Sequence, residues 1–289
     1  MAESPSHRFG QVIGELLEAV VRPQFEQFCQ QQGLYLDHQR RERKARRGRK
    51  VSWEDHYSNI HDLDFVIEHD GTDNELGQPV AFIEVAWRRY TKHSRNKAQE
   101  IQGSILPLAE KYKWNNPFLG TVLAGVFTKG SLEQLRSLGF HILYFPYETL
   151  IAAFASENID IKFDESTPDE VFRACTERIV NAPENVMERI KEHLIQANQL
   201  QIDEFFLALN QRLGRNIYRV LIVPLYGRMN QFATIENALN FLEQHQIYEG
   251  SGEFRKYEVR VEFSNGDKVE ASLTSKQSVR EFLTLIKAR

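Results

Sequence analysis

The sequence predicts a mixed α/β (α+β) fold in which a central mixed sheet is flanked by helices, followed by a C-terminal helical and α+β region. Three observations predict this fold. Apolar residues recur at helical spacing over residues 9–29 and 96–112, with two strand-like segments between them. A nearly continuous apolar run at residues 119–127 is typical of a strand buried on both faces. From residue 216 onward the expected order changes to strand, helix, hairpin and helix.

Composition indicates a globular protein with a substantial core. The chain has 289 residues, of which 42% are hydrophobic, and we expect two domains at residues 1–160 and 161–289. There is neither a membrane-length apolar run nor the apolar core of a signal peptide near the N-terminus, so a cytoplasmic protein is expected. No strand is followed by a glycine-rich phosphate loop, so no nucleotide cofactor is expected.

Two acidic residues interrupt the two strands that are expected between the helices. Asp64 falls inside the alternating segment at residues 63–67, and Glu84 lies in the middle of the β-rich run at residues 80–87. Two buried acids on neighbouring strands repel each other unless a cation lies between them. Because Mg²⁺ prefers carboxylate oxygen and water, this pair predicts a site for Mg²⁺ or Mn²⁺.

These residues resemble the motif of the PD-(D/E)XK nuclease superfamily of restriction-endonuclease-like enzymes. That motif places an Asp at a strand start and, some tens of residues later, a Glu or Asp, one residue and a Lys on the adjacent strand. Residues 63–67 (LDFVI) match the first half, while Glu84 and Val85 match the second, with Ala86 where the lysine is expected. The resemblance covers roughly the first half of the chain, and it implies a restriction-endonuclease-like core.

The resemblance also implies where the missing lysine could come from, since the family tolerates its relocation to the following helix. Lys97 lies at the edge of that helix's apolar stripe, so it leans toward the sheet. We therefore expect Asp64, Glu84 and Lys97 to be catalytic, with Lys92 and Arg88 as alternatives for the lysine role. The lysine would orient or help deprotonate the attacking water and stabilise developing charge.

A simpler interpretation needs no metal. In it Asp64 caps a turn, Glu84 pairs with Arg88 or Arg89, and Lys97 is a solvated helix residue. Each residue alone favours this interpretation, whereas their order of strand, strand and helix favours the nuclease.

Glu18, in the first helix, lies away from that helix's apolar stripe and is an ordinary solvated acid in the simplest interpretation. Related nucleases sometimes recruit a first-helix acid to the metal, so the resemblance makes Glu18 a further candidate ligand.

Two segments concentrate positive charge. Residues 40–50 hold eight Lys or Arg against one Glu, a charge of +7, so the overall charge of −4 leaves −11 for the rest of the chain. Residues 88–97 form a second basic segment, which is expected to be a loop beside the acid pair. Such segments are typical of phosphate contacts, although a solvated, disordered loop is the plain alternative for the first. The expected contacts to double-stranded DNA are Arg40, Arg41, Arg43, Lys44, Arg46, Arg47, Arg49, Lys50, Arg88, Arg89, Lys92, Ser94 and Arg95.

The three rings that come after the first basic segment have two possible uses. Trp53, His56 and Tyr57 could contact bases, or they could anchor this part of the chain to the core.

The C-terminal region is expected to serve DNA-site recognition or dimerisation. A hairpin is expected around Asn265 and Gly266, a strong turn signal. Basic residues in and near that hairpin could contact DNA or could simply form its solvent-exposed face. They are Arg255, Lys256, Arg260 and Lys268.

Together these features predict a Mg²⁺-dependent endonuclease that hydrolyses DNA, a sequence-specific type II restriction endonuclease acting as a homodimer. A structure-selective junction resolvase is the alternative within the class, and an RNA-directed nuclease is a third possibility. From a different class, a catalytically inactive nuclease-fold protein that binds DNA or another partner is the alternative that Ala86 favours.

Overall fold

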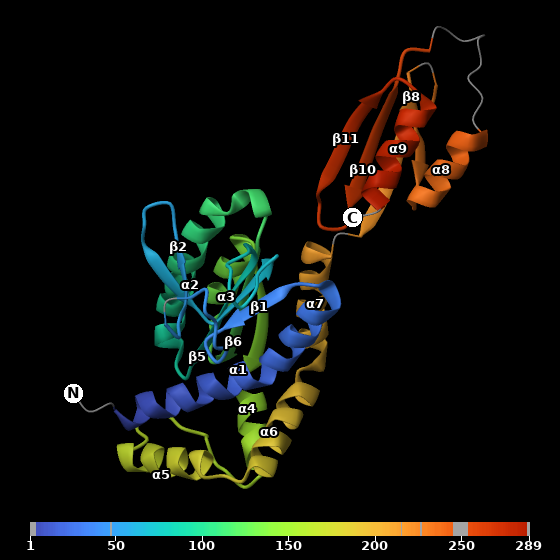
Figure 1. The fold of residues 1–289 in the computed structure, drawn as a ribbon. Coiled ribbons are helices and arrows are strands. Elements are labelled where there is room, and N and C mark those ends of the chain that lie inside the picture. The colour runs from blue at the N-terminus through green and yellow to red at the C-terminus, as the bar shows by residue number, and fades with distance from the viewer. Residues whose placement is uncertain (1–3, 47, 215, 226, 245–253, 288–289) are drawn as a thin grey trace. The chain divides into compact units, whose positions relative to one another are not determined.

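The computed structural model describes residues 4–46, 48–214, 216–225, 227–244 and 254–287 (Figure 1). The chain divides into two compact units, Met1–Ala208 and Leu209–Arg289. This division lies further along the chain than the boundary expected after residue 160, because helix α5 (Asp169–Val180) packs against the first helix and α6 (Glu184–Ala197) against α4. Among the described residues, no helix has both the length and the apolar character that crossing a membrane requires.

A five-stranded mixed sheet forms the centre of the first unit (Figure 1). Its strands, in spatial order, are β1 (Tyr35–His38), β4 (Phe65–His69), β5 (Gln78–Arg88), β6 (Phe118–Gly125) and β7 (Phe140–Pro146). The pairs β1–β4 and β4–β5 are antiparallel, while β5–β6 and β6–β7 are parallel. The predicted central mixed sheet flanked by helices is therefore confirmed.

Two long helices cover opposite faces of this sheet. Helix α1 (Pro5–Gln32) begins at Ser4, whose side chain accepts a hydrogen bond from the His7 amide, and continues through Pro23 without restarting. It packs beneath β4 and β5, where its Phe25 contacts Phe65 and its Phe9 contacts Trp87. Helix α2 (Thr91–Lys111) covers the other face.

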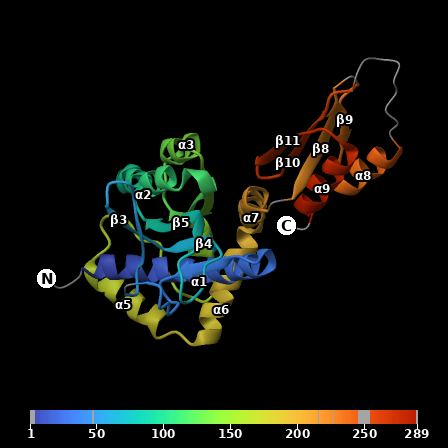
Figure 2. The same cartoon turned by 45° about the horizontal axis from the view of Figure 1, so that its top comes forward.

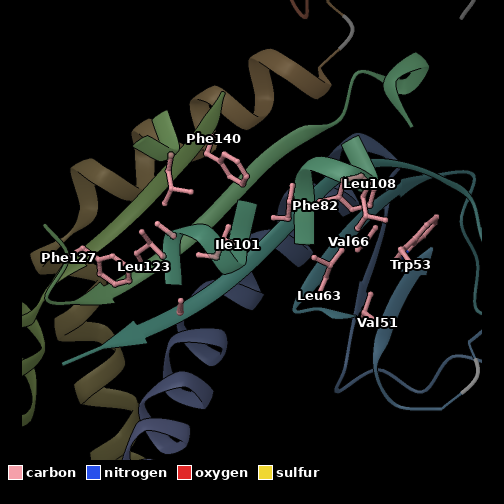
Figure 3. Close-up of a cluster of buried hydrophobic side chains, with 14 residues drawn as sticks. Val51, Trp53, Leu63, Val66, Phe82, Ile101, Leu108, Leu123, Phe127 and Phe140 are labelled. Carbon is pink, nitrogen blue, oxygen red and sulfur yellow. The ribbon is translucent and has the colours of Figure 1, made fainter. Parts of the chain in front are cut away.

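The core beneath α2 is drawn in Figure 3. Val66 and Phe82, from neighbouring strands, pack against Ile101 and Leu108 of α2. Alternation along each strand explains why Val66 and Phe82 meet α2 while Phe65 and Trp87 meet α1. The acid Glu84 lies between Phe82 and Ala86 in the sequence, so it projects toward the α2 face of the sheet.

The alternation expected across residues 63–67 breaks at Asp64. Leu63 ends β3 (Ile60–Leu63), which pairs only with β2 (Val51–Glu54) as a separate two-stranded ribbon. The next strand, β4, begins at Phe65 and pairs with β1 and β5. The expectation that Asp64 sits inside a strand is therefore wrong: it lies where the chain passes from the ribbon to the main sheet. A residue at such a junction has no ladder to disturb, which removes the usual cost of Asp in a strand.

The remaining elements of the first unit are helical. They are the short turn η1 (Lys113–Asn115) and the helices α3 (Lys129–Ser137), α4 (Tyr147–Ala155), α5, α6 and α7 (Gln199–Leu213), and α7 runs across the division between the units.

The second unit is an antiparallel sheet covered by helices on one face. Its spatial order is β11 (Lys268–Leu273), β10 (Tyr257–Phe263), β8 (Ile217–Pro224) and β9 (Asn230–Phe232). Figure 2 shows α8 (Ile235–Gln244) and α9 (Lys276–Lys287) beside this sheet, and their apolar residues form one core with it. The expected hairpin is confirmed: Gly266 has a φ of 86° in the turn between β10 and β11, a conformation that suits glycine.

Ion pairs cover much of the surface of the β10–β11 hairpin. From the sequence, basic residues of this surface could contact DNA. Arg260 bonds Glu270 at 2.7 Å, and Lys256 bonds Glu258 at 2.5 Å. The acids offset these cations, and DNA contact by the hairpin stays a prediction.

Candidate functional site

Asp64 and Glu84 face each other across the start of β4 and the middle of β5. Phe65 pairs with Ile83 in the antiparallel ladder, so the same register continued by one residue sets Asp64 opposite Glu84. The Val85 amide donates to Asp64 Oδ2 at 2.6 Å, and the two carboxyl groups are hydrogen-bonded to each other. Asp64, from the junction before β4, and Glu84, from β5, thus converge on one point.

The pair is short of positive charge. Burial raises the pKa of Glu84 well above its ordinary value, and the neighbouring charge of Asp64 raises it further. Burial also raises the pKa of Asp64, against the lowering effect of the Val85 amide and the Glu84 hydrogen bond. A carboxyl pair of this kind retains a proton more strongly than free carboxyl groups do. It also matches a divalent cation, which could replace the proton between the two groups.

Lys97 is the cation of α2 that acts on both acids. Its charge lowers the pKa of Asp64 and of Glu84, and 20% of its side chain is exposed. Its ammonium lies 3.4 Å from Glu100, and Arg88 lies 3.5 Å from the same carboxylate. Glu100 therefore holds two of the three candidates for the lysine role beside each other. The i,i+3 spacing of Lys97 and Glu100 is the sequence signal that could have identified Glu100.

Ala86, at the position of the motif lysine, is 4% exposed and belongs to the core beneath α2. The side chain of Lys92 lies outside the described part of the structure.

Glu18 lies near the acid pair without joining it. Its carboxylate accepts from Gln39 at 3.1 and 3.0 Å, while burial and the charge of Asp64 both raise its pKa. Within the described part of the chain, no group of three or more His, Cys, Asp or Glu is arranged to hold a metal ion. A bound metal would therefore depend on Asp64 and Glu84, which suits Mg²⁺ because that ion uses one or two carboxylates and keeps several waters.

A cavity of about 680 Å³ is lined by Val85 and Ala86, the two residues that follow Glu84, while Asp64 and Glu84 are not among its lining residues. The first turns of α1, the end of β5 and the second and third turns of α2 line it, including Ala86, Arg88 and Lys97. Gly10 and Gly14 form part of its α1 wall. Their i,i+4 spacing in an amphipathic helix is the sequence signal that could have identified a gap on that side of α1.

The first basic segment divides into a buried part and an exposed part. The Arg43 side chain is fully buried, where it bonds Asp37 at 2.9 Å and Glu68 at 2.9 Å. Arg46 is 4% exposed at its side chain and lies 3.2 Å from Asp37. These two guanidinium groups are used inside the first unit, so we leave them out of the DNA-contacting surface.

The other cations of this segment lie nearer solvent. Arg40 and Arg41 are partly exposed beside Glu15 and Asp73, respectively, and Lys50 is exposed beside Asp62. Lys44 and Arg49 are exposed. Arg47 lies outside the described residues. The DNA contacts of all these residues stay predictions.

The second basic segment is mostly helix rather than loop, because α2 begins at Thr91. Ser94 is fully buried, donates to the Thr91 carbonyl and lies 3.1 Å from Ser131, so its hydroxyl serves the fold and not a phosphate. Arg89 stacks on the rings of Tyr90 and Phe172. Arg95 is exposed.

The three rings after the first basic segment have different positions. Trp53 is buried and packs edge-on against Phe82 and Tyr112, which anchors the β2–β3 ribbon to the core. Tyr57 is 84% exposed at the end of that ribbon, and His56 is also exposed.

Comparison with known proteins gives no family for this chain. No family model matches it, and no curated protein matches it either. A solved structure titled as the crystal structure of a protein of unknown function, AF1548, is similar over 66% of this chain and 98% of its own, with a TM-score of 0.30 and 13% identity. A similarity at that level carries no functional argument, so a function for this protein has to be inferred from the site itself.

Proposed function

We propose that this protein is a Mg²⁺-dependent endonuclease that hydrolyses DNA phosphodiester bonds. One observation carries the proposal: the half-buried carboxyl groups of Asp64 and Glu84 are hydrogen-bonded to each other, and Lys97 acts electrostatically on both. Structural acids in a core are ordinarily matched by a built-in cation or by full hydrogen bonding. Here both acids have raised pKa values, which is typical of a site that awaits a ligand of opposite charge.

The roles of the protein groups are set by their positions. Asp64 and Glu84 would hold the ion, and the Val85 amide keeps the Asp64 carboxylate oriented toward β5. Lys97, which remains partly exposed, would face the reacting phosphate and stabilise the negative charge that develops there. When bound, Mg²⁺ supplies Lewis acidity toward the phosphoryl oxygens and lowers the pKa of a coordinated water.

The finer form of the proposal is a type II restriction endonuclease that cuts double-stranded DNA as a homodimer. Cutting both strands of a symmetric site suits a two-fold dimer. The exposed cations Lys44, Arg49 and Arg95 support a polyanionic substrate, since such charges contribute affinity without selecting a sequence.

The test is cleavage of unmethylated phage DNA with Mg²⁺, beside a chelated control. We expect discrete fragments from the wild-type protein and none from Asp64→Asn or Glu84→Gln. Asp62→Asn is the matched control, because Asp62 is an exposed acid two residues from Asp64 and pairs with Lys50 instead. Equal cleavage by the wild type and Glu84→Gln would exclude the proposed site.

A second function is favoured by Ala86, which occupies the motif lysine position inside the core. An inactive nuclease-fold protein that binds DNA would shift DNA in a gel after chelation and would cut it with neither Mg²⁺ nor Mn²⁺. In that case, Glu84→Gln would bind DNA as the wild type does. Those three results together would replace the endonuclease proposal with the binding protein.

A further inference from the structure

On its α1 side, the cavity between α1 and the end of β5 is lined by two glycines, Gly10 and Gly14. A Cβ atom added at Gly14 would meet no atom within 4 Å, and one added at Gly10 would meet Trp87 at an ordinary 3.6 Å. Packing therefore does not require glycine at either position. Glycine inside a helix is less favourable than alanine, so two of them in α1 reduce the stability of that helix. Their absent side chains leave open the space that forms the cavity.

The described charged residues around this space are mostly cations. Arg88, Arg89 and Lys97 line it, with Glu100 as the carboxylate among its lining residues. Glu100 is shared between Arg88 and Lys97, at 3.5 and 3.4 Å. The remaining cation, Arg89, lies over the rings of Tyr90 and Phe172, while its buried Nε and Nη1 atoms have no hydrogen-bond acceptor in the described structure. Positive charge in a partly enclosed site favours an anionic ligand.

The size and position of the cavity restrict what that ligand can be. A volume of about 680 Å³ lies in the range of small-molecule sites, so it admits one nucleotide of a strand but not a duplex. Val85 and Ala86, which come directly after Glu84, belong to its lining. A strand whose phosphate lies at the acid pair would therefore continue into this space.

We propose that the cavity between α1 and the end of β5 holds the sugar and phosphate of the nucleotide next to the scissile phosphate, with Gly14 as the surface against which that nucleotide packs. The inference rests on the proposed nuclease function, which it extends from a metal site to a path for one DNA strand. Arg88 and Arg89 neutralise the phosphate of that nucleotide. Strand passage through such a space requires local separation of the duplex at the cut.

The test separates stability from binding. Gly14→Ala and Gly14→Leu should both raise Tm, by about 2–4 °C, because the helix gains a better helix former and the added Cβ meets no atom. Gly14→Leu should weaken binding of a short fluorescein-labelled DNA duplex about tenfold or more, measured by anisotropy with Ca²⁺ in place of Mg²⁺. Gly14→Ala should have a smaller effect in the same direction.

Gly103 provides the matched control. It is an exposed glycine inside α2, and a Cβ added there also meets nothing within 4 Å. Gly103→Ala and Gly103→Leu should raise Tm similarly and leave the dissociation constant of the duplex unchanged. A gain in stability with a loss of binding at Gly14, and a gain in stability alone at Gly103, is the expected pattern.

Unchanged binding by Gly14→Leu, or no binding of the duplex by the wild type, would overturn the proposal. If Gly14→Leu does not fold, Gly14→Ala decides by the same comparison with Gly103→Ala.

Different results would reject the strand path and the nuclease function. Loss of binding in Gly14→Leu, without metal-dependent cleavage by the wild type, would retain the strand path and reject the nuclease. Metal-dependent cleavage with unchanged kcat/KM in Gly14→Leu would retain the nuclease and reject the strand path.

Discussion

Two pairs of carboxyl groups lie at the two ends of β4, one fully buried and the other half-buried, and they are stabilised in opposite ways. Asp37 and Glu68 are bridged by the buried guanidinium of Arg43, and the Gly77 amide also donates to Glu68. Asp64 and Glu84 contact each other directly, and Lys97 acts on them from α2. The first pair is completed by the protein itself. The second retains an unfavourable repulsion, which a bound cation would relieve.

This difference shows how a structural acid pair can be told from a functional one. A buried carboxylate with a hydrogen-bonded arginine has no further need of a ligand, whereas two facing carboxyl groups with raised pKa values do. Residue type is the same in both cases, and the second pair is less buried than the first. The position of the nearest cation makes the distinction.

The largest expected effect tests the structural pair. Arg43→Met should lower the free energy of unfolding by about 3–5 kcal/mol, because it removes the cation that two buried carboxylates share. Urea denaturation followed by far-UV circular dichroism measures the change. Arg40→Met is the control and should cost less than about 1 kcal/mol, since the Arg40–Glu15 pair is half exposed. If Arg43→Met lowers the free energy of unfolding as little as Arg40→Met does, Arg43 does not stabilise the Asp37 and Glu68 pair as described.

The next effect tests the functional pair through metal binding. Mg²⁺ at about a hundred times its dissociation constant should stabilise the wild-type protein by ~2.7 kcal/mol, because it binds the native state only. Glu84→Gln should lose this stabilisation, while Arg40→Met should retain it. Thermal melts with and without Mg²⁺ give the comparison, and equal melting shifts in the wild type and Glu84→Gln would place the metal elsewhere.

A third effect comes from the direction of the pKa shifts. Because the folded protein raises the pKa of Glu84 above its ordinary value, the native state binds more protons than the unfolded state between those two values. The contribution of the protonated Glu84 carboxyl group to stability is complete below its pKa in the unfolded state. This contribution is lost as pH rises through its pKa in the folded state. Without metal, Glu84→Gln should therefore be more stable than the wild type near pH 8, by roughly 1–3 kcal/mol. Urea denaturation of both proteins at several pH values up to about pH 8 measures this difference. If the free energy of unfolding depends on pH in the same way in both proteins, the raised pKa does not belong to Glu84.

The smallest effect concerns the exposed part of the basic segment that also supplies Arg43. Lys44→Gln should leave stability unchanged and weaken DNA binding equally for all sequences. It should reduce the slope of log K against log salt by about 0.9 if Lys44 contacts one phosphate. Anisotropy at several salt concentrations measures this slope. An unchanged slope would remove Lys44 from the DNA-binding surface.

Much of the fold is predictable from local patterns in the sequence. Apolar spacing predicts α1, α2 and β6, and the Asn265 and Gly266 pair predicts the β10–β11 turn. These patterns succeed because the spacing of buried side chains is fixed by the period of each element. The same spacing predicts a start for α2 that is too late, since the basic residues after Thr91 lack the apolar side chains that reveal a helix.

The candidate site is predictable in its members and not in its surroundings. Two acids on neighbouring strands and a lysine at a helix edge are visible in the sequence, and the structure brings Asp64 and Glu84 together with Lys97 near them. The role of Arg43 is not visible there, because its partner Glu68 is 25 residues away and nothing local distinguishes it from Arg49. The shared use of Glu100 by Arg88 and Lys97 also depends on how α2 lies over β5.

By itself, the sequence determined the long helices, the strands that carry or follow the two acids and the mixed character of the sheet, but not β1 or the β2–β3 ribbon. Only the tertiary structure decided that Asp64 occupies a junction between two sheets, that Arg43 is a core residue and that Gly14 faces an open space. The physical reason is the separation along the chain of the residues that interact. Helical and strand periods depend on neighbouring residues, whereas strand register, burial of a charge and the shape of a cavity depend on residues brought together from distant parts of the chain.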